Sequence, residues 1–154
     1  MLKLLVADDE RILREAVCYL IDWKSIGIEL AASCKNGREA YEEACRTKPD
    51  IILTDIKMPG LSGLDLVEKL SEPGRVLEFI LLTGYADFEY AHRALSHRVH
   101  HYLLKPCNEQ QIIEAVQQAA QSIYTRRQLQ QMEPTCAGVA RPESSETVQK
   151  VVDY

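Results

Sequence analysis

The sequence predicts an α/β fold, a (βα)5 doubly wound sheet of five parallel strands with the flavodoxin-like order of elements. Five short aliphatic runs recur along the chain, at residues 3–7, 28–33, 50–54, 78–83 and 101–104. Several of them are apolar throughout, as strands are when a parallel sheet is covered on both faces. Stretches with apolar residues at spacings of three and four alternate with these runs, and that spacing is typical of amphipathic helices.

The helices are expected at residues 10–21, 36–47, 63–71 and 87–96, with a fifth helix from Glu109 to about Met132. Asn36, Asp87 and Asn108 precede three of these stretches, where their side chains can accept hydrogen bonds from the first free backbone N–H groups. Three of the five expected helices therefore have a recognisable start.

The last helix carries an apolar stripe from Ile112 to Tyr124. Beyond Tyr124 the helix is longer than a compact domain needs, so it either projects and pairs with a second chain or frays as a tail. Residues 133–146 contain two prolines and no periodicity, which predicts a linker, and the closing "TVQKVVDY" looks like the start of another helix. We therefore expect one domain at 1–122, followed at 123–154 by a helical extension and linker.

The composition limits the classes of function. A net charge of −5 over 154 residues argues against this stretch binding nucleic acid by itself, because such proteins present a basic face to phosphate. Five cysteines without a CxxC pair suit reduced thiols in a cytosol. No signal-peptide core and no membrane-spanning run is found, so the expected location is cytoplasmic, with no membrane partner.

Polar residues follow four of the five predicted strands. Asp8 and Asp9 come after the first strand, Asp55 after the third, Thr83 ends the fourth, and Lys105 follows the fifth. In an open parallel sheet the carboxyl ends of the strands form the ligand site. These side chains are therefore expected to lie together.

Three converging carboxylates repel one another, so such a site requires a cation. Oxygen donors without cysteine or histidine favour Mg²⁺, which keeps several waters and is completed by a phosphate oxygen. A carboxylate can also attack phosphorus, and Asp55, at a strand end before a turn with Pro59 and Gly60, is the best candidate nucleophile. Lys105 and the Thr83 hydroxyl would then stabilise the phosphoryl oxygens.

With these residues in order, the sequence resembles the receiver domain of bacterial two-component response regulators. The motifs that carry the resemblance span about residues 2–122 and are Asp8 with Asp9, Asp55 in "DIKMPGLSG", Thr83 with Gly84, and Lys105 with Pro106. The resemblance implies that a sensor histidine kinase phosphorylates Asp55. It also implies a cis peptide bond before Pro106, phosphoryl contacts from Thr83, Gly84 and Lys105, and Mg²⁺ held by Asp8, Asp9, Asp55 and the main-chain carbonyl of Lys57.

The resemblance further implies a switch in which Thr83 moves toward the phosphoryl group and Tyr102 turns inward. Asp22 with Trp23, Asn36 with Gly37, and "TGYADFEYAHRAL" from Thr83 are similar to receivers attached to AraC-type helix-turn-helix transcription factors. DNA would then be bound only through a C-terminal domain outside this chain. The chain itself would be a signalling domain, catalysing only its own phosphorylation and dephosphorylation, and a homodimer is possible.

Rival interpretations remain. A phosphatase of the haloacid dehalogenase type needs an aspartate two residues after the nucleophile, where this chain has Lys57. A flavin carrier needs a phosphate loop after the first strand, where the acids of "DDE" would repel the phosphate. A pure interaction module requires that Asp55 is never modified. A metal site at His92, His97, His100 and His101 matches no closed zinc pattern.

Overall fold

A computed structural model of the chain describes residues 1–72, 75–84, 99 and 101–136, with side chains as far as Leu129. The strands are β1 (Leu2–Ala7), β2 (Ile28–Cys34), β3 (Ile51–Asp55), β4 (Glu78–Thr83) and β5 (His101–Leu104). The helices are α1 (Arg11–Tyr19), η1 (Trp23–Ile26), α2 (Gly37–Thr47), α3 (Gly63–Leu70) and α5 (Glu109–Cys136). The chain divides into a unit at Met1–Ile123 and a second unit from Tyr124 onward, and the sheet belongs to the first unit.

The sheet has five strands in the order β2-β1-β3-β4-β5, and every pairing is parallel. This is the doubly wound order in which the chain reverses direction across the sheet between β1 and β3. The expected fold class is confirmed. The switch in strand order places the ends of β1 and β3 side by side, and Asp8 and Asp55 stand there.

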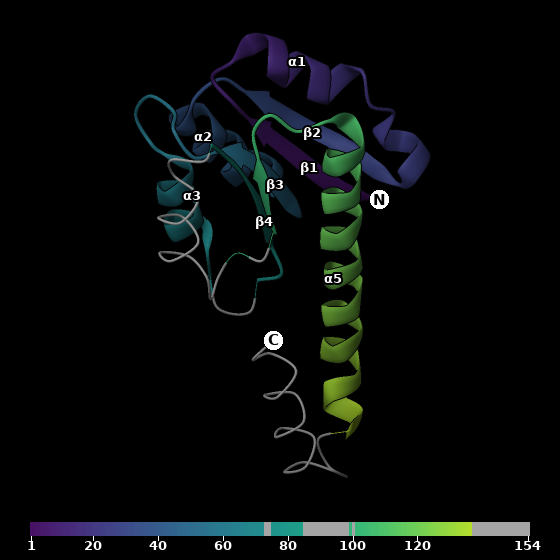
Figure 1. The fold of residues 1–154 in the computed structure, drawn as a ribbon. Helices are drawn as coiled ribbons and strands as arrows, with labels where there is room; N and C mark the ends of the chain where they lie inside the picture. Colours follow the sequence, from purple (N-terminus) through teal and green to yellow (C-terminus); the bar gives the residue numbers. More distant parts are fainter. Residues whose placement is uncertain (73–74, 85–98, 100, 137–154) are drawn as a thin grey trace. The chain divides into compact units, whose positions relative to one another are not determined.

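Two apolar layers cover the two faces of the sheet. On one face α1 and α5 pack against strand residues through Val17, Val116 and their neighbours (Figure 1). On the other face α2 and α3 contribute Ala40, Ala44 and Leu66. Because both faces are covered, the central strand β3 is buried at every position, which explains why its first three residues are aliphatic.

Side-chain caps begin three of the helices. Asn36 accepts a hydrogen bond from the Glu39 N–H at 2.8 Å, and Asn108 accepts one from the Gln111 N–H at 2.8 Å, as expected from the sequence. Ser62 and Asp65 form a reciprocal capping box at the start of α3. The expected helix at 87–96 and its cap at Asp87 lie outside the described residues.

Three details differ from expectation. The short helix η1 was not predicted; its buried Trp23 donates its indole N–H to the Val17 carbonyl at 2.9 Å. Helix α5 ends at Cys136, so the first residues of the expected linker, including Pro134, are helical, because composition locates helix ends only to within a few residues. Tyr124, expected in the apolar stripe of this helix, is exposed.

Among the described residues, no helix combines the length and the apolar character needed to cross a bilayer.

Candidate functional site

Three carboxylates meet at the carboxyl ends of β1 and β3. Asp8 and Asp9 follow β1, and Asp55 is the last residue of β3. One oxygen of each lies within 4.8 Å of an oxygen of the other two. Asp8 and Asp55 are buried, whereas Asp9 is exposed. The three acids therefore converge as predicted. Because two of the three side chains are buried, water screens the repulsion between their charges incompletely.

Asp8 is held in place by its backbone and by one of its two carboxylate oxygens. Its N–H donates to the Cys34 carbonyl at 3.0 Å, and its carbonyl accepts a hydrogen bond from Arg14 at 2.7 Å. Its Oδ1 accepts from the Glu10 N–H at 2.9 Å, while the buried Oδ2 makes no hydrogen bond and has the Lys105 ammonium 3.3 Å away. Burial raises the pKa of the Asp8 carboxyl, although the Glu10 N–H and Lys105 oppose that shift.

Asp55 begins a loop that two backbone contacts hold against the sheet. The Ile56 N–H donates to the Leu82 carbonyl at 3.2 Å, and the Gly63 N–H donates to the Ile56 carbonyl at 2.8 Å. A Cβ atom on Gly63 would lie 2.4 Å from the Asp55 carbonyl oxygen, so only glycine permits this approach. The start of α3 is therefore packed directly against the end of β3.

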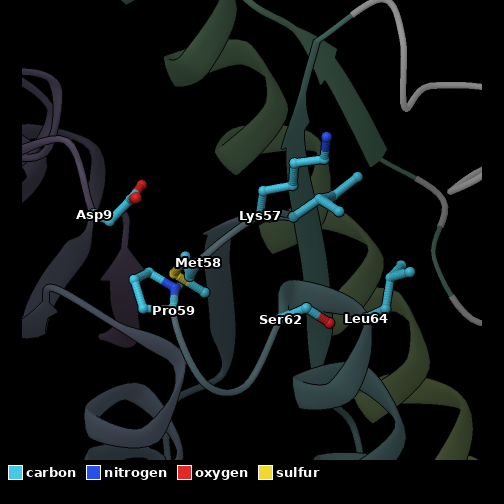
Figure 2. Close-up of a pocket in the computed structure, with 7 residues that line it drawn as sticks. Asp9, Lys57, Met58, Pro59, Ser62 and Leu64 are labelled. Carbon is cyan, nitrogen blue, oxygen red and sulfur yellow. The ribbon is translucent and has the colours of Figure 1, made fainter.

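The same loop forms one side of a pocket of about 490 Å³. Asp9 lies on one side of the pocket and Ser62 and Leu64 lie on the other, with Met58 and Pro59 between them (Figure 2). Lys57 also lines the pocket, and its side chain is exposed. The pocket thus opens beside the exposed member of the three carboxylates.

Lys105 is the cation of the site. Its ammonium lies 2.9 Å from Asp55 Oδ2, 3.0 Å from Glu10 Oε1 and 3.3 Å from Asp8 Oδ2. Its backbone N–H donates to the Thr83 carbonyl at 2.8 Å, and its peptide bond to Pro106 is cis. Burial works against the charge of Lys105, but the hydrogen bonds to Asp55 and Glu10 outweigh burial and raise its pKa.

Thr83 ends β4 next to β3, and it is buried. Its hydroxyl donates to the Gly84 carbonyl at 3.1 Å. Among the described residues, no atom lies within 4 Å of the position that a Cβ atom on Gly84 would take. Tyr102 pairs with Leu81 in the sheet register, is partly buried, and packs against the layer formed by α2 and α3; burial raises the pKa of its phenol.

Four of the residues singled out from the sequence therefore lie in direct proximity: Asp8, Asp9, Asp55 and Lys105. Glu10 was not predicted to contact Lys105, although it directly follows the two aspartates and so lay next to the site in the sequence. Among the four histidines, His101 hydrogen-bonds Glu78 at 3.0 Å, and the other three lie outside the described residues. Within the described part of the chain, the acidic cluster is the group with the spacing of metal ligands.

Comparison with known protein families agrees with this geometry. The model of the response regulator receiver domain matches residues 4–117, which is most of the chain. The chain belongs to this family. The matched residues include the site described above, in which the acids lie at the ends of β1 and β3 and the lysine follows β5.

Several similar proteins are named as regulators of transcription. This chain is 48% identical over 118 residues to the "Uncharacterized transcriptional regulatory protein YesN" of Bacillus subtilis. The aligned segment covers 77% of this chain and 32% of that protein. The chain thus spans about a third of the length of this relative.

Two solved structures are similar over 82% of this chain and 98% of their own. One is the receiver domain of AraT, a response regulator from Geobacillus stearothermophilus, with a TM-score of 0.75 and 36% identity. The other is a two-component transcriptional regulator AraC from Clostridium phytofermentans, with a TM-score of 0.76 and 28% identity. Receivers of this type therefore share the fold described here.

The residues present fit Mg²⁺. Asp8 Oδ2 is a buried oxygen without a hydrogen bond, and one carboxylate oxygen each of Asp8, Asp9 and Asp55 lies within 4.8 Å of the others. One ammonium group cannot balance the acids around it, and hard oxygen donors with solvent on one side are the ligands that Mg²⁺ prefers. The site could therefore hold a divalent cation.

Proposed function

We propose that this chain is the phospho-accepting receiver of a two-component transcriptional response regulator, in which Asp55 takes a phosphoryl group from a sensor histidine kinase in a Mg²⁺-dependent reaction. The observation that carries the proposal is the cluster itself. Three carboxylates lie within 4.8 Å of one another, and Lys105 contacts Asp55 at 2.9 Å. A stability role alone does not account for so much negative charge at one end of a sheet.

Asp8, Asp9, Asp55 and the main-chain carbonyl of Lys57 would hold the Mg²⁺ ion. When bound, the ion would offset charge on the carboxylates and on the incoming phosphoryl group. Asp8 is oriented for this role by the Glu10 N–H and by Arg14. The glycine contact at residue 63 holds the loop that contains Lys57.

Asp55 acts as the nucleophile. One carboxylate oxygen attacks the phosphorus of the phosphohistidine, the P–N bond breaks, and its electron pair stays on the imidazole, which takes up a proton. Lys105, the Thr83 hydroxyl and the Gly84 N–H would stabilise the three phosphoryl oxygens. Water later cleaves the acyl phosphate, so the chain returns to its first state and is not an enzyme acting on other substrates.

The output is a change of conformation. The Thr83 hydroxyl, which now donates to the Gly84 carbonyl, would turn to the phosphoryl group, and Tyr102 would move further into the layer that it already borders. A new anion with its hydrogen bonds biases such a two-state equilibrium. The surface around β5 and α5 would carry the signal, by a homodimer or by contact with an output domain.

The similarity to longer transcriptional regulators supports a proposal about the wider partners. We propose that the chain belongs to a cytoplasmic regulator whose DNA-binding domain lies C-terminal to the receiver. The similar regulator from Bacillus subtilis is about three times as long as the matched segment, which leaves room for a further domain. The receiver itself, at a net charge of −5, would not contact DNA.

The test uses acetyl phosphate and Mg²⁺, followed by intact-mass measurement. We expect a gain of one phosphoryl group that disappears when Mg²⁺ is removed and in the variant Asp55→Asn. The matched control is Asp22→Asn, because Asp22 is exposed and caps η1 without a side-chain hydrogen bond. No mass gain in the unaltered chain would refute the proposal, and turnover of a phosphorylated substrate would indicate a phosphatase.

A further inference from the structure

Glu10 is a fourth carboxylate beside the site, outside the three that would hold a metal. Its Oε1 lies 3.0 Å from the Lys105 ammonium, across 95 residues of sequence. The Glu10 side chain is 65% exposed and that of Lys105 is 20% exposed. The ion pair therefore lies at the outer edge of the site, on the solvent side of Asp8 and Asp55.

The backbone of Glu10 is fixed, so its side chain has a defined starting point. Its N–H donates to Asp8 Oδ1 at 2.9 Å, and its carbonyl accepts from the Arg14 N–H at 2.9 Å. Glu10 is the N-cap residue of α1, but its side chain makes no capping hydrogen bond. The carboxylate is directed to Lys105 and takes no part in the helix start, where a shorter acid or a serine is the usual choice.

The ammonium of Lys105 has three N–H donors. Two of them are used in hydrogen bonds to Asp55 and Glu10, and the contact with Asp8 is longer. A cation or a phosphoryl group bound at Asp8 and Asp55 would compete for the oxygens that Lys105 now contacts. The contact with Glu10 does not depend on those oxygens, so it can persist when they are engaged.

We propose that Glu10 is a positioning residue for Lys105: its carboxylate keeps the ammonium group at the edge of the site, so that Lys105 remains directed at the phosphoryl oxygens. This inference rests on the proposed phosphorylation of Asp55. It assigns to Glu10 a part in the reaction that differs from metal binding, because Glu10 acts only through Lys105. The energetic basis is a charge-assisted hydrogen bond at a partly buried group.

The test compares Glu10→Ala and Glu10→Gln with the control Glu15→Ala. Glu15 lies in α1, the helix that Glu10 caps, and pairs with a basic residue, Arg11 at 3.3 Å, but no contact with Lys105 is found. The rate of phosphorylation by acetyl phosphate at saturating Mg²⁺ should fall about tenfold in Glu10→Ala, the equivalent of losing one charged hydrogen bond. Glu10→Gln keeps an oxygen acceptor and should retain an intermediate rate.

Two further measurements separate positioning from a general charge effect. Mg²⁺ affinity, measured by calorimetry, should change less than about threefold in Glu10→Ala, because Glu10 is not a ligand. In a Lys105→Met background, Glu10→Ala should have no further effect on the rate, since two residues that act as one unit are not additive.

The possible failures are distinguishable. If the unaltered chain gains no phosphoryl group, the proposed function fails and this inference fails with it. If the unaltered chain is phosphorylated but Glu10→Ala reacts as fast as Glu15→Ala, or faster, the proposed function stands and the inference is wrong. A loss of Mg²⁺ affinity that matches the loss of rate would also overturn it.

Discussion

The two ends of the sheet both contain a buried carboxylate next to a basic side chain, but the balance of charge differs. At the amino ends of β4 and β5, Glu78 and His101 form one pair at 3.0 Å, and both side chains are nearly buried. At the carboxyl ends, Lys105 faces Asp55, Glu10 and Asp8 at 2.9 to 3.3 Å, with Asp9 close by. At the amino ends one acid faces one basic side chain, whereas at the carboxyl ends several acids surround a single lysine.

The difference shows how a structural pair can be told from a reactive site. Burial lowers the pKa of His101, so the Glu78 contact is a hydrogen bond to a neutral ring near neutral pH. Each side chain of that pair therefore has a hydrogen-bond partner within the protein. The opposite end has an oxygen of Asp8 without a hydrogen bond and an excess of negative charge, so it would stabilise a bound cation. That cation, together with Lys105, would offset the charge of a phosphoryl group at Asp55.

Replacing Lys105 should have the largest effect on this comparison. Without Mg²⁺, Lys105→Met should lose about 3 kcal/mol of unfolding free energy, because buried carboxylates are left without their cation. With saturating Mg²⁺ the loss should be clearly smaller, since the ion offsets the same charges, while phosphorylation by acetyl phosphate should slow about a hundredfold and stay measurable. Urea denaturation with and without Mg²⁺ measures this, with the exposed Lys24→Met as control. An equal loss under both conditions would contradict the account.

Replacing His101 should have a smaller effect that does not respond to metal. His101→Ala removes one hydrogen-bond partner of the buried Glu78, at a cost of about 2 kcal/mol. Because the pair lies at the other end of the strands, the loss should be the same with and without Mg²⁺, and the phosphorylation rate should stay within about twofold. A strong dependence of the loss on Mg²⁺ would show that the two ends are coupled.

Neutralising one acid of the site should stabilise the metal-free chain. Asp8→Asn removes a buried charge that repels Asp55, so the unfolding free energy without Mg²⁺ should rise by about 1 kcal/mol. Mg²⁺ affinity should fall at least tenfold in the same variant, because a ligand is lost. Calorimetry and urea denaturation give the two values. A drop in metal-free stability would refute the idea that charge is in excess at this end.

The smallest expected effect is a pH dependence from His101. Since burial lowers its folded pKa, the unfolded chain binds the proton first as pH falls, so stability should decline below about pH 6.5 and level off below the folded pKa. The decline should be about 1 kcal/mol or less. The measurement compares the unfolding free energy of this chain with that of His101→Asn between pH 5 and pH 8. The decline should be present in this chain and absent in the variant. An identical pH dependence in both would show that His101 is not its source.

Much of the fold and of the candidate site could be predicted from local patterns. Continuous aliphatic runs identified the strands because a strand covered on both faces tolerates few polar residues, and β3 is buried at every position. Asp8, Asp9, Asp55 and Lys105 were found because each follows a strand, and parallel strands bring their carboxyl ends to one edge. The helix η1 was missed because four residues show no periodicity.

The order of residues along this chain by itself determined the strands, the helices that cover them and the edge at which the acids collect, since these depend on periodicity and on the geometry of parallel pairing. Only the tertiary structure decided which acid each base contacts. Lys105 reaches Glu10 across 95 residues, and Glu78 meets His101 across 23 residues, because register and side-chain packing bring them together. Such pairings depend on distances between elements, and no local pattern in a sequence records them.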